Sequence, residues 1–203
     1  MKLTWNGHAC FTIQTQDSTL VLDPYQDGTI PGLSNLRLKG DAVLCSHGHY
    51  DHDAVETVEL SGKPLQMDIE EFLVYHDDQK GAIRGQTMVR IISAEGLRVA
   101  HMGDVGCRLE PEELDRLQDL DALLVPVGGY YTINAAMAYE LVQAVKPRVV
   151  IPMHYRGEEF GYDVLAKVDD YLALCGNGVT YDGNTLELTK DTPDQTAVLT
   201  YQK

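Results

Sequence analysis

Histidine and aspartate crowd one short segment, Ser46–Asp53, which reads Ser-His-Gly-His-Tyr-Asp-His-Asp. Imidazole and carboxylate groups are ligands for zinc, manganese or iron, and the chain has no Cys-x-x-Cys pair that would indicate a thiolate site. In an extended loop, side chains two residues apart point the same way, so His47 and His49 can share one ion. The adjacent Asp51 and His52 face apart and can serve a second. The spacing therefore predicts a site for two metal ions.

Three more residues with ligand chemistry follow short apolar runs that are typical of strands. They are His76 after Phe72–Tyr75, Asp104 after Leu97–Ala100 and His154 after Val149–Ile151. Functional groups gather at the carboxyl ends of strands in open α/β sheets, so these loops and the loop after Ala42–Cys45 can assemble one cleft. A lone histidine at a strand end more often caps or lies on the surface, but the dense motif favours convergence.

The elements that must position these residues form a mixed pattern. Further strands are predicted at Phe11–Ile13, Thr19–Leu22, Ala122–Val125, Thr185–Leu188 and Ala197–Tyr201, and helices at Ala54–Leu60, Glu112–Leu117, Ala135–Val145 and Val164–Leu174. No linker, low-complexity tract or repeat divides the chain, which predicts one domain over residues 1–203. The pattern indicates an α/β or α+β fold with helices covering sheets.

The charge balance bears on partners. The chain has 31 acidic and 16 basic side chains and a formal net charge of −15, which disfavours broad binding to nucleic acid or to an anionic membrane. No apolar run approaches the roughly 20 residues that span a bilayer, and the N-terminus has no signal-like apolar region. We therefore expect a cytoplasmic protein that binds neither nucleic acid nor membrane, with its oligomeric state left open.

The order of these motifs resembles the metallo-β-lactamase superfamily. The match runs from His47-x-His49-x-Asp51-His52 through His76 and Gly103-Asp104 to His154. A narrower resemblance is to the bacterial and archaeal branch related to ascorbate-6-phosphate lactonase, carried by Trp5-x-Gly7-His8, Leu22-Asp23-Pro24, His76-Asp77-Asp78, Pro126-Val127-Gly128-Gly129 and Pro152-Met153-His154-Tyr155. The resemblance implies a four-layer αββα sandwich, with two sheets face to face and a metal cleft along one edge.

The resemblance also implies a role for each ligand. It puts His47, His49 and His76 on the first metal, Asp51, His52 and His154 on the second, and Asp104 between the two. Asp23 resembles an aspartate that orients a ligand histidine through its other ring nitrogen, although an Asp-Pro turn would also explain it. His101 lies in the strand that leads to Asp104, so we expect it to be buried behind the ligands or in the core.

Asp51, Asp104 and His8 are the candidate catalytic residues. The place of His8 in the narrower motif implies that it lies near the cleft, where it would hold substrate or act as general acid. A surface turn at Asn6-Gly7 is the alternative. Zinc is the first expectation for two ions per chain, with manganese or iron possible, and such a pair would generate hydroxide near neutral pH.

The basic residues near the predicted site indicate the substrate. Lys80 and Arg84 follow His76 in a segment with two glycines that could close over a ligand, and Arg156 follows His154. Solvated surface charges are the alternative. The predicted function is hydrolysis of a small anionic ester, a phosphoester or a lactone. An iron-dependent redox enzyme of the same fold and a non-catalytic metal-binding protein are the two alternatives.

Overall fold

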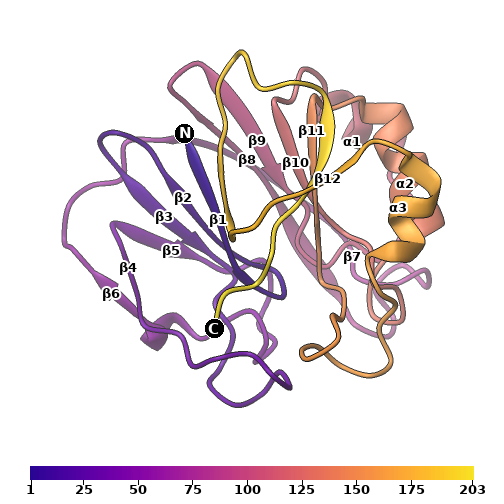
Figure 1. The fold of residues 1–203 in the computed structure, drawn as a ribbon, viewed down its shortest axis with the longest axis horizontal. Coiled ribbons are helices and arrows are strands. Elements are labelled where there is room, and N and C mark those ends of the chain that lie inside the picture. The colour runs from indigo at the N-terminus through magenta and orange to yellow at the C-terminus, as the bar shows by residue number, and fades with distance from the viewer.

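Two β-sheets lie face to face in the computed structural model, which describes residues 1–203 (Figure 1). The five-stranded sheet has the order β13 (Thr185–Glu187), β1 (Lys2–Gly7), β2 (Cys10–Gln14), β3 (Thr19–Leu22) and β5 (Ala42–Leu44). The seven-stranded sheet has the order β12 (Gly178–Thr180), β14 (Gln195–Val198), β11 (Val149–Met153), β10 (Ala122–Pro126), β9 (Leu97–His101), β8 (Gln86–Ala94) and β7 (Asp68–Tyr75).

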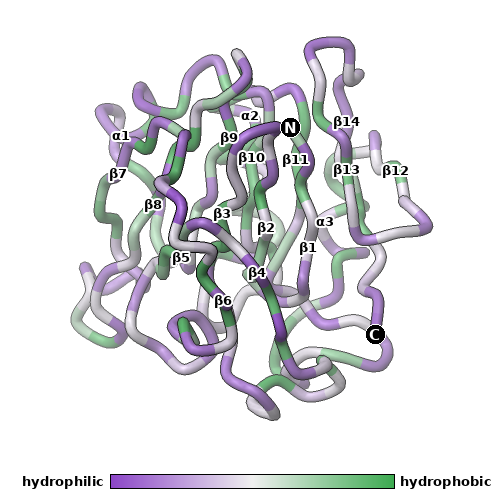
Figure 2. Tube along the Cα trace, turned by 90° about the vertical axis from the view of Figure 1, so that its left-hand side faces the viewer, coloured by the Kyte–Doolittle hydropathy of each residue, from purple (hydrophilic) through white to green (hydrophobic).

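The core between the sheets follows from the hydrophobic pattern of the strands. In β2 and β3, Phe11, Ile13, Leu20 and Leu22 belong to a core cluster of 38 buried residues, as alternation along a strand predicts. Every residue of β10 and β11 is buried, because these inner parallel strands are covered on both faces. Figure 2 shows hydrophobic colour concentrated in the strands at the middle of the molecule.

Three α-helices cover the outer face of the seven-stranded sheet (Figure 1). They are α1 (Pro111–Arg116), α2 (Ala135–Val145) and α3 (Asp169–Cys175). The longest, α2, begins where the Asn134 side chain accepts a hydrogen bond from the Met137 amide and ends at Lys146, which has left-handed backbone, just before Pro147. The predicted helix over Ala135–Val145 is confirmed, since cap, apolar face and stop signal all agree locally.

The other outer layer has no α-helix. It consists of coil, the short parallel pair β4 (Leu38–Gly40) and β6 (Val58–Leu60), and the 3₁₀ turn η1 (Val55–Thr57). A second core cluster lies under this layer and includes Cys10, Val21 and Val58. The predicted sandwich fold is confirmed, but the predicted helix over Ala54–Leu60 is wrong, because its β-branched residues disfavour helix and the pairing of β6 with β4 buries Val58.

Other differences lie where long-range contacts decide local structure. The predicted helix over Val164–Leu174 begins only at Asp169, because the Ala166 amide donates to the Gly128 carbonyl and its carbonyl accepts from the Arg156 amide. The strand predicted at Ala197–Tyr201 instead spans Gln195–Val198. The prediction omitted β1, β4, β8 and β12. The hairpin of β2 and β3 is confirmed, with Phe11 opposite Leu22.

Strand direction brings the chemical residues to one edge. β9, β10 and β11 are parallel, and β7 also runs parallel to β9 because β8 is antiparallel to both. The loops that carry His76, Asp104 and His154 therefore leave the sheet at the same edge. β3 and β5 are parallel as well, so Asp23 and His47 leave their sheet together. No helix is both long and apolar enough to cross a membrane.

Candidate metal centre

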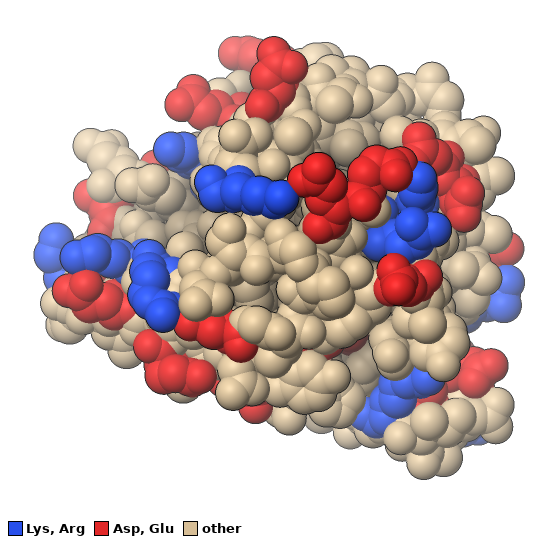
Figure 3. All heavy atoms as spheres, turned by 60° about the horizontal axis from the view of Figure 1, so that its bottom comes forward, with Lys and Arg blue, Asp and Glu red and all other residues tan.

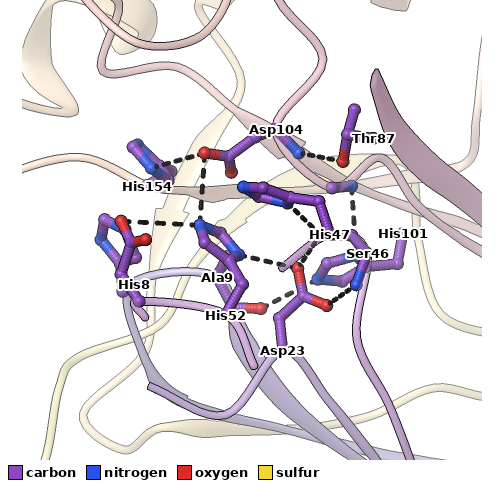
Figure 4. Close-up of polar contacts among 12 residues, drawn as sticks. His8, Ala9, Asp23, Ser46, His47, His52, Thr87, His101, Asp104 and His154 are labelled. Atoms are coloured by element: carbon purple, nitrogen blue, oxygen red, sulfur yellow. Dashed lines mark hydrogen bonds and ion pairs between the residues drawn. The ribbon is translucent and has the colours of Figure 1, made fainter. Parts of the chain in front are cut away.

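The predicted ligands converge at one edge of the two sheets, and Figure 4 shows His47, His52, Asp104 and His154 among them. Their ligand atoms form three overlapping groups, each with all atoms within 4.8 Å of one another: His47, His49 and His76; His47, His52 and Asp104; and His8, Asp51, His52 and His154. The overlap at His47 and His52 joins the groups into one cluster. The structure thus brings together all seven residues predicted to bind metal and adds His8 to them.

Asp23 orients the residues of the centre from the turn after β3. Its side chain is fully buried, and its Oδ2 lies 2.8 Å from Nδ1 of His52, while Oδ1 accepts the Ser46 amide at 2.6 Å. Burial would raise the pKa of Asp23, but the hydrogen bond from His52 and the nearby His101 lower it overall. An ionised Asp23 accepts the Nδ1 proton of His52, which directs Nε2 toward the cluster. Burial would lower the pKa of His52, but Asp104 and Asp23 raise it, so a metal ion bound at Nε2 would take the place of a proton there.

Ser46 links Asp23 to His47 and orients the His47 ring. Its hydroxyl donates to Oδ2 of Asp23 at 2.5 Å, and its oxygen lies 2.9 Å from Nδ1 of His47. Since the single hydroxyl proton goes to Asp23, the oxygen accepts from His47, so His47 carries its proton on Nδ1. One carboxylate therefore sets the tautomer of two candidate ligand histidines and directs both Nε2 atoms to the cluster.

Asp104 occupies the centre of the cluster. Its Oδ2 lies 3.2 Å from Nε2 of His52, 3.2 Å from Nε2 of His154 and 3.5 Å from Nε2 of His76. The Thr87 hydroxyl accepts the Asp104 amide at 3.1 Å. Gly103 precedes it with a φ of +52°, and a Cβ there would lie 2.5 Å from the Thr87 hydroxyl oxygen. Only glycine fits this turn, which aims the carboxylate at histidines from both sides.

Eight buried polar atoms of the cluster lack hydrogen-bond partners. They are both ring nitrogens of His8 and His154, Nε2 of His47 and His52, Nδ1 of His76 and Oδ1 of Asp104. Leaving so many buried polar atoms unpaired is costly unless a cation coordinates them. Burial lowers the pKa of His47 to about 3, so its imidazole is neutral, the form that binds metal. The donor set therefore fits divalent metal ions.

His8 joins the cluster through the turn after β1. The Trp5 indole donates to the His8 carbonyl at 2.9 Å, and the His154 amide donates to the same oxygen at 3.1 Å. Nε2 of His8 lies 3.3 Å from Oδ2 of Asp51, and its ring centroid lies 3.9 Å from that of His154. Burial, followed by the nearby His154, lowers the pKa of His8 to about 4. The side chain is buried against the cluster, so His8 is not on a surface turn.

His101 lies behind the ligands. Its Nε2 donates to the Ala9 carbonyl at 2.9 Å, and its Nδ1 accepts the Gly103 amide at 3.2 Å. Burial lowers its pKa, consistent with a neutral ring that bridges the two sheets. His101 belongs to none of the ligand groups.

Backbone strain concentrates at the centre. His8, Asp23 and His154 have φ values of +53°, +47° and +52°, a region that residues with a Cβ rarely adopt. Such strain persists where the surrounding structure over-determines it, and it clusters at functional sites. The three turns lie at the carboxyl ends of β1, β3 and β11, where they place their side chains against the cluster.

A cavity of about 220 Å³ opens beside the ligands. Its lining consists of His49, Tyr50, Asp51, His76, Arg84, Asp104, Tyr131 and Tyr162. Of the three predicted substrate-binding cations, the structure brings only Arg84 to this cavity. Lys80 is exposed on the same loop, and Arg156 donates its Nε to the Leu165 carbonyl at 2.8 Å.

Several residues of the site were not predicted. Ser46 and Thr87 contact the ligands only because of tertiary packing, although Ser46 stands beside the histidine motif. Tyr162 lines the cavity with a buried hydroxyl that has no hydrogen-bond partner, and its ring centroid lies 5.8 Å from that of His8. No sequence signal marks Tyr162, which reaches the site from the long segment between β11 and α3.

Comparisons with known proteins agree with this fold. A family model described as a β-lactamase superfamily domain matches residues 2–154. Since the match covers most of the chain, the protein belongs to the metallo-β-lactamase superfamily. The predicted superfamily resemblance is confirmed.

Individual relatives indicate the class of protein more narrowly. The chain is 30% identical over 231 residues to a UPF0173 metal-dependent hydrolase of Archaeoglobus fulgidus, covering 91% of this chain and 100% of the relative. It is 28% identical to one from Thermoplasma acidophilum, covering 89% and 93% of the two chains. A Thermotoga maritima crystal structure, described as a candidate zinc-dependent hydrolase of the superfamily, matches with a TM-score of 0.78, 32% identity and 99% of both chains. The protein is therefore a metal-dependent hydrolase of this superfamily.

Proposed function

We propose that this protein binds two metal ions, zinc being the first expectation, and hydrolyses a phosphoester or lactone of a small anionic molecule. The observation that carries the proposal is the set of imidazole and carboxylate atoms that converge without hydrogen-bond partners beside a cavity lined by Arg84. We assign His47, His49 and His76 to one ion, Asp51, His52 and His154 to the other, and Asp104 to both. Manganese and iron suit the same donors.

Bound metal ions would lower the pKa of water and polarise the ester oxygen. The chain's own groups supply orientation. Asp23 and Ser46 hold His52 and His47 in the tautomers that direct Nε2 to the cluster. The cavity volume of about 220 Å³ lies below the range of drug-sized pockets and favours a small substrate.

We assign His8 a role at the leaving group: its neutral imidazole would donate a hydrogen bond to the leaving oxygen, or act as general acid where its hydrogen bond with Asp51 raises its pKa. Its Nε2 lies 3.3 Å from Asp51, and His8 shares no ligand group with His49 or His76. General acid catalysis matters most for poor leaving groups. The His8→Gln variant should therefore lose about 100-fold in kcat on an alkyl ester and much less on a 4-nitrophenyl ester. An equal loss on both would indicate that His8 acts only as a ligand.

Elemental analysis combined with a substrate panel tests the whole proposal. The panel contains a 4-nitrophenyl phosphodiester, a 4-nitrophenyl phosphomonoester and a γ-lactone, each assayed with zinc, manganese or iron restored. We expect two metal ions per chain and hydrolysis of at least one member, with Asp104→Ala lowering kcat/KM by more than about 100-fold. A folded protein without tight metal, or a fully active Asp104→Ala variant, would overturn the assignment.

A further inference from the structure

The loop between β7 and β8 is organised by one carboxylate. Asp77 is buried, and it accepts four backbone hydrogen bonds: Gln79 N at 2.8 Å and Gly81 N at 2.8 Å on Oδ1, and Ile83 N at 3.0 Å and Arg84 N at 2.7 Å on Oδ2. Both oxygens are thus used. The loop wraps around the Asp77 side chain, and this carboxylate holds the backbone of the loop from within.

The ends of this loop are also joined. The Gly85 amide donates to the Gly81 carbonyl at 3.0 Å, and the His76 amide donates to the Gly85 carbonyl at 3.0 Å. The two glycines, which suggested a flexible lid, have φ values of +79° and +76° and serve the tight turns instead. The loop is therefore a fixed arm that begins at a ligand histidine and carries Arg84 back to the cavity.

Arg84 is the one arginine whose guanidinium has no polar partner. The other seven each donate to a carboxylate or carbonyl oxygen, and Figure 3 shows basic side chains lying next to acidic ones on the surface. Arg84 is half-buried and lines the cavity with His76 and Asp104. Its guanidinium carbon lies 5.5 Å from the ring centroid of Tyr131, which supports it from one side.

A fixed cation without a partner, beside metal ligands, is suited to bind an anion. A guanidinium forms two parallel hydrogen bonds with a carboxylate or phosphate, and binding is stronger when no loop has to be ordered. In a chain with a net charge of −15, an unpaired arginine directed into a cavity is poorly explained by solubility. The cavity is continuous from the metal ligands to Arg84, so one small molecule can reach both.

We propose that Arg84 binds a second anionic group of the substrate, a carboxylate or phosphate separate from the bond that is cleaved, and that Asp77 is the positioning residue that holds Arg84 there. This inference rests on the hydrolase function proposed above for the same cavity. It narrows the substrate to a small molecule with two polar ends, one at the metal centre and the other at Arg84.

Calorimetry on the metal-loaded protein tests the subsite without turnover. Glutarate and butyrate differ by one terminal carboxylate. We expect glutarate to bind about tenfold more tightly, the value of one charge-assisted hydrogen-bonded contact. Arg84→Gln and Asp77→Asn should each abolish this preference, so that glutarate binds no more tightly than butyrate. The double variant should lose no more than either single variant, because both act on one contact.

Two controls separate positioning from general damage. Asp78→Asn alters the neighbouring, exposed aspartate and should keep the glutarate preference. Hydrogen exchange of residues 79–84 should quicken in Asp77→Asn and stay slow in Arg84→Gln. If Asp77→Asn does not fold, Gly81→Ala distorts the same arm, since its Cβ would lie 2.8 Å from the Gly85 carbonyl oxygen, and should abolish the preference as well.

The outcomes distinguish this inference from the proposed function. No preference for glutarate in the native protein, or a preference that survives in Arg84→Gln, overturns the anion subsite. A preference that survives in Asp77→Asn overturns the positioning role. Failure of every ester to be hydrolysed would count against the hydrolase proposal and would leave the binding results intact.

Discussion

At the scale of single residues, buried carboxylates fix the protons of the groups that donate hydrogen bonds to them. Asp23 has both carboxylate oxygens engaged, by Ser46 and by His52, and it sits with a φ of +47°. Asparagine tolerates this left-handed backbone, so an Asn substitution alters the hydrogen bonds and not the turn. The effect of Asp23 on the metal centre can therefore be measured apart from its effect on the backbone.

We predict that Asp23→Asn weakens metal binding about 10- to 100-fold, because the amide cannot accept from both Ser46 and His52 and the ligand tautomers are no longer imposed. Competition with a metallochromic indicator measures this affinity. The exposed Asp17 offers a matched control, and Asp17→Asn should bind metal as the native protein does. Equal affinity in the two variants would contradict the orienting role.

Asp121, away from the site, is another carboxylate that is held by several hydrogen bonds. It accepts the Arg98 amide at 2.8 Å and Arg148 at 2.7 Å, and these bonds with Lys190 outweigh burial and lower its pKa. A carboxylate with a lowered folded-state pKa stabilises the protein above its ordinary pKa, and this stabilisation is lost as pH falls toward the folded value.

We therefore predict that Asp121→Asn lowers the free energy of unfolding by about 2 kcal/mol at pH 7. The difference from the native protein should shrink between pH 5 and pH 3.5. Urea titrations of both proteins across this range measure it. A difference that does not vary with pH would mean that the charge of Asp121 contributes nothing.

At the scale of elements, close backbone contacts hold the ligand loops in place. Gly106, which follows Asp104 by two residues, donates its amide to the Tyr75 carbonyl at 2.9 Å. A Cβ on Gly106 would lie 2.4 Å from the carbonyl carbon and oxygen of His76. The loops after β7 and β9 therefore share one contact that sets the distance between their ligands, His76 and Asp104.

We predict that Gly106→Ala displaces His76, costs about 1–3 kcal/mol of stability and weakens metal binding, because backbone atoms cannot yield as side chains do. Gly183→Ala is the matched control, since nothing lies within 4 Å of a Cβ there. Thermal unfolding and metal content measure both effects. Unchanged metal content in Gly106→Ala would show that the loops adjust independently.

At the scale of the whole molecule, the two sheets supply stability and the centre joins them. The core of 38 residues lies between the sheets, whereas the unpaired ligand atoms come from loops of both. Removing the metal should leave the fold intact and lower its stability, because a ligand that binds only the folded state stabilises it by mass action.

We predict that a chelator lowers the melting temperature with little change in far-UV circular dichroism. Where the free metal had been 1,000 times its Kd, the free energy of unfolding should fall by about 4 kcal/mol. Re-addition of zinc, manganese and iron in turn would rank the metals. Asp104→Ala should show a smaller shift. The same melting temperature with and without chelator would argue that the cluster binds no metal tightly.

Local signals in the sequence determined much of this protein. The hairpin of β2 and β3, the helix Ala135–Val145 and the loop Ser46–Asp53 all depend on periodicity, caps and spacing within a few residues. The candidate ligands were predicted from motif order together with strand-end reasoning, and the superfamily was predicted from the same motifs.

Tertiary structure alone decided the rest. The segment Ala54–Leu60 became a 3₁₀ turn and a strand because it pairs with β4. Arg84, and not Lys80 or Arg156, reached the cavity because Asp77 holds four amides of its loop. These outcomes depend on hydrogen bonds and contacts between segments far apart in sequence or folded back on themselves. Residue type and spacing indicate which groups can do chemistry. The position of each group depends on the competition among all the tertiary contacts that the chain can form.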